Sequence, residues 1–289
     1  MVLRGFIEEM FSGLKISCFS LCAFTLFFFM GCEKKDNAKP PKLILSVHEE
    51  SDEKAVQLAD ALIEACGGME NWNNTRFLVW RFLGKRYNVW DRWTGNYRSG
   101  SRTTITLLNL NDKTGEAWMH GRKITDADEL KRVIDYSYNG WINDSYWMFL
   151  PFKLKDDGVI LNYLGQEKTI VGDMAEVVRV TFDNVGLTPD NMYHLYLDPE
   201  THLIKEWDYY VSTADSAPQF RMEWNNFQKY GELLLSDERG RKKHTHIAAL
   251  DKLPSDIFTK PERPDWKQFI PGLSEQKTVK GDPGPEEEN

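Results

Sequence analysis

The alternation of apolar and polar side chains beyond residue 76 constrains the fold more than any other feature of the sequence. Large apolar residues recur at every second position, as in Leu78, Trp80 and Phe82, and a period of two is typical of β-strands with one buried face. Short turn sequences, such as residues 111–115, separate the runs. Strands joined by such short connections pair antiparallel. The runs predict about ten strands in one large curved antiparallel sheet.

Two helices are predicted beside this sheet. Apolar residues recur at helical spacing within residues 51–66 and predict an amphipathic helix of about four turns. Thr125 and Asp128 resemble a capping box and predict the start of a second helix, which we expect to end at residues 139–140. Cys66 lies on the apolar stripe of the first helix, so we expect its thiol to be buried. The predicted fold class is α+β, with helices packed on the concave side of the sheet.

The N-terminal segment is typical of a secretory signal. Residues 16–30 are continuously apolar and follow Lys15. A run of about 15 residues is shorter than the roughly 20 that cross a bilayer as a helix, and it matches the apolar region of a signal peptide. The translation start could be Met1 or Met10, since a start at Met10 removes two acidic residues from the segment before the apolar run.

The end of the apolar run, Gly31-Cys32, resembles the lipobox of bacterial lipoproteins. That resemblance implies cleavage before Cys32, a diacylglycerol on its thiol and an acyl group on its amine, which together anchor a protein stably to a membrane. The alternative is an uncleaved membrane anchor with an incidental cysteine. The expected location is the cell envelope, on the periplasmic or outer face of the outer membrane. The predicted organisation is a signal peptide (1–31), a lipidated cysteine with a flexible tether (32–50), a folded domain (51–264) and a polar, disordered tail (265–289).

Composition and motifs exclude several function classes. The formal net charge of -8 argues against general nucleic-acid binding, which needs a basic face. No P-loop, dinucleotide-binding fingerprint, nucleophile elbow or HExxH zinc motif is present. The sequence therefore predicts a monomeric protein without a cofactor and without catalytic activity.

One histidine pair supports a further hypothesis. His244 and His246 flank Thr245 on a predicted strand, where alternate side chains point to the same face. Two such rings could hold a metal ion if a neighbouring strand supplied a carboxylate, and the chain would then be a metal-dependent hydrolase. The alternative is a solvated strand edge beside a basic run of the sequence.

The apolar face of the sheet is the main candidate for a ligand site. Two helices do not easily cover ten strands spaced about 4.8 Å apart, so part of the concave face could stay open to a lipid, a lipoprotein acyl chain or another apolar ligand. The alternative is a filled core, in a structural or interaction lipoprotein whose partner is another protein. The candidate ligand-contacting residues are Trp80, Phe82, Trp147, Phe149, Val180, Phe182, Trp207, Tyr209, Phe220, Met222 and Trp224.

Five segments carry a resemblance to a known family: residues 65–72, 146–154, 193–198, 224–227 and 231–235. Over about residues 51–264 the chain is similar to the LolA, LolB and LppX superfamily of lipoprotein carriers. It looks most like the uncharacterised members that are themselves anchored. The resemblance implies a half-open β-barrel whose concave side shelters lipid under a helical lid. The shared motifs are structural, so no ligand-binding residue carries over from the family.

Overall fold

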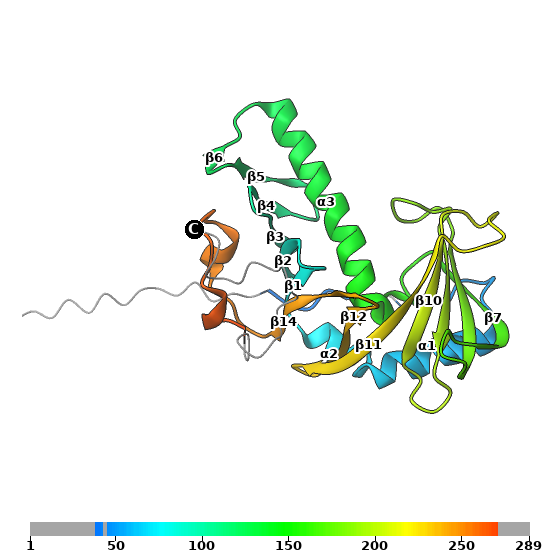
Figure 1. Cartoon of the computed structure of the whole chain (residues 1–289). Coiled ribbons are helices and arrows are strands. Elements are labelled where there is room, and N and C mark those ends of the chain that lie inside the picture. The colour runs from blue at the N-terminus through cyan, green and yellow to red at the C-terminus, as the bar shows by residue number, and fades with distance from the viewer. Residues whose placement is uncertain (1–37, 43–44, 271–289) are drawn as a thin grey trace, which may run out of the picture. The chain divides into compact units, whose positions relative to one another are not determined.

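Seven antiparallel strands form the first sheet, in the order β14-β1-β2-β3-β4-β5-β6 (Figure 1). The structure is a computed structural model that describes residues 38–42 and 45–270. The order follows from short hairpins, because each strand from β1 to β5 pairs with the next one in the chain. The bounds are β1 (Phe77–Phe82), β2 (Arg86–Asp91), β3 (Asn96–Gly100), β4 (Thr104–Asn109), β5 (Thr114–Met119), β6 (Arg122–Lys123) and β14 (Thr245–Leu250).

A second sheet of seven antiparallel strands has the order β13-β12-β11-β10-β9-β8-β7. A single residue, His244, separates β13 from β14, and its backbone N–H donates to the carbonyl of Asp237 at 2.7 Å. The continuous segment from β13 to β14 therefore pairs with β12 of the second sheet at its start. At its end it pairs with β1 of the first sheet, which brings the two sheets together. The bounds are β7 (Val159–Lys168), β8 (Met174–Phe182), β9 (Met192–Leu197), β10 (Ile204–Tyr210), β11 (Phe220–Tyr230), β12 (Leu233–Arg239) and β13 (Lys242–Lys243).

The predicted α+β class with large antiparallel sheets is confirmed. The described residues contain fourteen strands in two sheets, where the sequence predicted about ten strands in one. Part of the difference is β12, whose side chains do not alternate between apolar and polar. The predicted first helix is also confirmed as α1 (Glu53–Ala65), and a short α2 (Gly68–Asn74) that we did not predict follows it. Gly67 permits this abrupt restart because it adopts φ +112°.

The second helix, α3 (Ala127–Phe149), is longer than predicted. It runs through residues 139–140, where we expected it to end, and continues to the short 3-10 helix η1 (Leu150–Lys153). A glycine inside a helix costs about 1 kcal/mol, and a Cβ at Gly140 would lie 3.4 Å from the central carbon of the Arg86 guanidinium, which is an ordinary van der Waals contact. The N-cap is Asp126 rather than Thr125, and its side chain accepts from the N–H of Glu129.

One hydrophobic core runs through both sheets and contacts all three helices. The apolar stripe of α1 lies in this core, and Cys66 is fully buried with its thiol free, as predicted. Burial raises the pKa of this thiol to about 12, so it stays protonated near neutral pH. Among the described residues, no helix is long and apolar enough to cross a membrane.

A smaller core lies on the opposite face of the first sheet, where the C-terminal segment packs. This segment contains two 3-10 helices, η2 (Ser255–Phe258) and η3 (Trp266–Gln268). Trp266 is buried and stacks on Tyr87 with ring centroids 5.6 Å apart. The predicted start of a disordered tail at residue 265 is therefore wrong, because residues 265–270 complete this core. Residues 1–37, with Cys32, and residues 271–289 lie outside the described part of the chain.

Candidate functional site

Most of the predicted ligand-contacting face is packed core. Helices α1 and α3 supply side chains to the same core as the two sheets, so little of the concave face stays open. The fully packed candidates are Trp80, Phe82, Phe149, Val180, Trp207 and Trp224, and the partly buried candidates that pack against them are Trp147, Phe182, Tyr209, Phe220 and Met222.

One cavity of about 430 Å³ remains between the C-terminal half of α3 and strands β7 to β10. Three of the predicted residues line it, namely Trp147, Phe182 and Tyr209. The other large lining side chains are Trp141, Tyr146 and Tyr193, which were not among the candidates from sequence. A tilted contact between Tyr146 and Tyr193, with centroids 5.4 Å apart, makes much of one wall aromatic.

The mouth of this cavity is amphipathic. The loop between β8 and β9 forms one lip, and its Leu187 side chain is 48% exposed. Lys153 and Asp156 form the polar lip and pair at 3.7 Å. An apolar interior with few polar groups at its edge is the usual composition of a small-ligand pocket, and such pockets have volumes of about 300–1,000 Å³.

Two residues that line this cavity carry buried hydrogen-bond donors without an acceptor. The Tyr146 hydroxyl and the Trp141 Nε1–H have no hydrogen-bond partner in the described part of the chain. Burial, followed by the nearby Tyr193 and Asp156, raises the pKa of Tyr146 well above its usual value, so the hydroxyl keeps its proton. A buried donor left unpaired costs about 1–3 kcal/mol.

Two arginines fix the position of α3 and hence of the cavity wall. Arg86 on β2 donates two hydrogen bonds to the buried Asp144 of α3, at 3.0 and 2.6 Å. Arg239 on β12 is fully buried, stacks on Trp224 and donates to the carbonyl of Trp147 at 2.7 Å. Bidentate and charge-assisted bonds of this kind are among the stronger polar contacts in proteins. The wall that carries Trp141 and Tyr146 is therefore held in place before any ligand enters.

The histidine pair does not form a metal site as predicted. His244 contacts Phe82 in the main core, whereas His246 contacts Tyr87 on the opposite face of the first sheet. The reason is a β-bulge, because the register between β1 and β14 shifts and His246 adopts φ +54°. An extra residue in one strand reverses the facing of the side chains that follow it. Among the described residues, no group of three metal-ligating side chains is present.

Comparison with known proteins gives likenesses of fold. A model of a family of unknown function, DUF6503, matches residues 117–259. No curated protein matches. A solved DUF1329 family protein from Desulfovibrio piger is 11% identical, covers 73% of this chain and 100% of its own, and has a TM-score of 0.38. A domain from Vibrio parahaemolyticus named after outer membrane lipoprotein sorting is 10% identical, with 72% and 97% coverage and a TM-score of 0.38. MucB is 16% identical, with 74% and 64% coverage and a TM-score of 0.24. At such identities and TM-scores, these likenesses do not assign a ligand or an activity.

Proposed function

We propose that this chain is a binding protein rather than an enzyme, and that it holds an acylated amphiphile in the cavity between α3 and the second sheet. The observation that carries the proposal is the pair of buried, unpaired donors, Tyr146 Oη–H and Trp141 Nε1–H, on two residues that line an aromatic cavity. A pure hydrocarbon would leave both donors unpaired. An ester or carboxylate oxygen would accept from them while the acyl chain contacts the aromatic walls.

Replacing Tyr146 by phenylalanine separates binding from stability. The change removes an unpaired hydroxyl, so the free energy of unfolding should stay the same or rise by up to about 1 kcal/mol. The affinity for a fatty acid should fall about two- to tenfold, because one hydrogen bond to the acceptor oxygen is lost. The measurement is fluorescence titration of the purified full chain with a dansylated undecanoic acid, beside urea unfolding of the same samples.

A matched control is Tyr230→Phe. The Tyr230 hydroxyl donates to Asp237 at 3.2 Å and does not line the cavity. This variant should lose about 1 kcal/mol of stability and bind the probe like the parent. The ligand proposal fails if Tyr146→Phe binds the probe as tightly as the parent, or if the parent does not bind it. The packed core would then favour the alternative of a structural or interaction lipoprotein with a protein partner.

The proposal includes the membrane anchor at Cys32, which places the binding domain at the cell envelope. Its support is the sequence alone, since Cys32 lies outside the described residues. Mass spectrometry of the native protein should find an N-terminal peptide that begins at Cys32 and carries diacylglycerol and an additional acyl chain. An unmodified thiol or an uncleaved leader would remove the anchor from the proposal and leave the ligand cavity untouched.

A further inference from the structure

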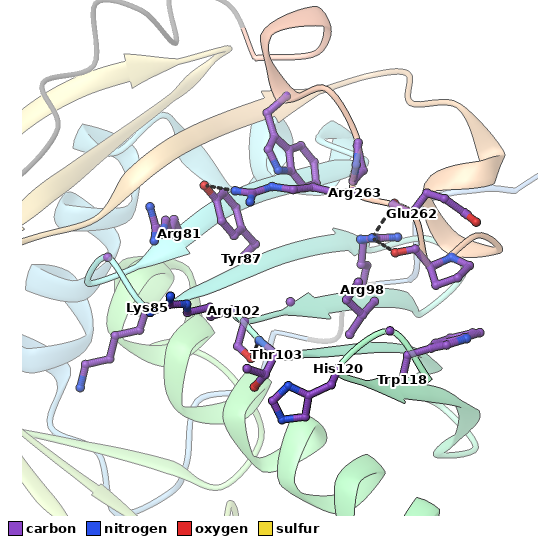
Figure 2. Close-up of a pocket in the computed structure, with 18 residues that line it drawn as sticks. Arg81, Lys85, Tyr87, Arg98, Arg102, Thr103, Trp118, His120, Glu262 and Arg263 are labelled. Atoms are coloured by element: carbon purple, nitrogen blue, oxygen red, sulfur yellow. Dashed lines mark hydrogen bonds between the residues drawn. The ribbon is translucent and has the colours of Figure 1, made fainter. Parts of the chain in front are cut away.

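A second and larger cavity, of about 1070 Å³, lies on the outer face of the first sheet, where the C-terminal segment packs (Figure 2). Its walls come from β1 to β5 and from residues 261–266. Among the lining residues that the structure describes, five carry a fixed positive charge and one, Glu262, carries a negative charge. The whole chain has a net charge of -8, so this cavity is a positively charged region of a negatively charged protein. The positive residues are Arg81, Lys85, Arg98, Arg102 and Arg263.

One of these cations has a structural task. Arg98 donates to four backbone carbonyls of the C-terminal segment, at 2.6 to 3.1 Å. It thereby holds the segment that forms one wall of the cavity, as Figure 2 shows beside Glu262. Carbonyl oxygens solvate the guanidinium but do not neutralise its charge. Burial lowers the pKa of Arg98 only to about 10, so its positive charge persists at neutral pH.

Two further cationic side chains pack against the aromatic ring of Tyr87. The Arg81 and Arg263 guanidinium groups lie 4.8 and 5.2 Å from the centroid of Tyr87, and Arg263 donates to the Tyr87 hydroxyl at 3.2 Å (Figure 2). Trp266 stacks on the same ring. Their positive field reaches the neighbouring His246, whose pKa is lowered to about 4 by burial and by Arg81 and Arg263. This histidine is therefore neutral at pH 7 and adds no charge of its own beside the two arginines.

The remaining two cations are available at the mouth. Lys85 and Arg102 are exposed, and within residues 38–42 and 45–270 their charged groups make no ion pair. Exposed cations beside a low-dielectric wall concentrate anions, because the wall focuses the electric field. Arginine in particular matches the geometry of phosphate oxygens with its planar fork of donors.

We propose that this cavity binds a phosphate group, carried either by a free phosphate compound or by a phospholipid headgroup. Glu262 is the one acidic side chain among the described lining residues, and five positive charges beside it disfavour a divalent metal ion. Trp118, which is only partly buried, also lines the cavity and would contact the apolar or ring part of the same ligand. The site is distinct from the cavity under α3, because it lies on the other face of the first sheet and shares no lining residue with it.

The test is calorimetric titration of the full chain with inorganic pyrophosphate at low ionic strength. The double variant Lys85→Glu with Arg102→Glu should bind it at least about tenfold more weakly, since two attractive charges become repulsive. Both side chains are exposed, so the fold should tolerate the change. The matched control reverses two exposed cations outside the cavity, Arg132→Glu with Lys229→Glu, and should bind like the parent.

Two soluble short-chain lipids, dihexanoyl phosphatidylglycerol and dihexanoyl phosphatidylcholine, distinguish the sources of phosphate. Tighter binding of the anionic lipid, lost in the Lys85/Arg102 variant, supports a headgroup ligand. Pyrophosphate binding without that lipid preference supports a free phosphate compound. The proposal is overturned if the parent shows no saturable pyrophosphate binding, or if the Lys85/Arg102 variant and the Arg132/Lys229 variant bind equally well.

Discussion

Trp207→Ala is expected to lower the free energy of unfolding by about 3–5 kcal/mol, which is the usual cost of removing a buried tryptophan. Trp207 on β10 is fully buried and meets three aromatic neighbours, with ring centroids 4.9 Å from Trp147, 5.0 Å from Tyr193 and 5.3 Å from Trp224. The backbone strands cannot collapse into the space because each is hydrogen-bonded on both sides. Urea or thermal unfolding, followed by circular dichroism, measures the loss.

Tyr209→Ala, two residues along the same strand, is the comparison that separates core from cavity. Tyr209 is only partly buried and lines the cavity under α3, which Trp207 does not. Its replacement should cost less stability than Trp207→Ala and should weaken uptake of the dansylated fatty acid more. Equal losses of stability, with unchanged uptake in both variants, would indicate that the whole face is packed core and that the cavity binds nothing.

The periodic parts of the fold could be predicted from sequence because their large apolar side chains recur at a regular spacing. Helix α1 shows this with its apolar stripe, and β1 shows it with Leu78, Trp80 and Phe82 at a period of two, although both faces of β1 are buried. Strand β12 was missed because apolar and polar side chains do not alternate along it. Leu233 and Leu235 are buried at its start, whereas Ser236, Asp237 and Arg239 are buried farther along and make hydrogen bonds to β11 and to the carbonyl of Trp147. A hydrophobic pattern does not report side chains of this kind.

The candidate site was predicted only in part, for a related reason. Alternation along the strands identified Phe182 and Tyr209 as apolar-face residues. It does not show which residues of that face pack against a helix and which line a cavity. That choice depends on the path of α3, which we expected to end at residues 139–140. Tyr146 and Trp141 lie beyond that point, so their unpaired donors could not be anticipated. The aromatic-rich run that follows Gly140 was the feature of the sequence that could have indicated these residues.

The basic cavity could not be predicted from the sequence, because the segments that form its walls are far apart in the chain and come together only in the fold. Arg98 contacts residues about 160 positions later in the chain, such as Ile257 and Lys260. In the sequence, the basic residues are scattered among a majority of acidic ones. The bulge in β14 then turns His246 toward this face and away from His244. The same bulge that removes the predicted metal site therefore places a titratable ring beside the arginines.

His246 should make the protein less stable in mild acid. Burial, Arg81 and Arg263 lower its pKa from 6.5 to about 4 in the folded chain. Below pH 6.5, His246 is protonated in the unfolded chain but stays neutral in the folded chain. The free energy of unfolding therefore falls as the pH drops toward 4. Between pH 7 and pH 5 the loss from this group is about 2 kcal/mol.

His246→Asn tests this contribution, since asparagine tolerates the positive φ of 54° at this position and does not titrate. Urea unfolding of parent and variant at pH 7 and pH 5 should show a smaller loss in the variant, by about 2 kcal/mol. His244 is also buried, and burial and Arg239 hold its pKa well below the usual value. It titrates in both proteins, so its effect cancels in the difference. Parallel losses in parent and variant would mean that the arginines around Tyr87 do not reach His246, and that the positive field in this cavity is weaker than its residues indicate.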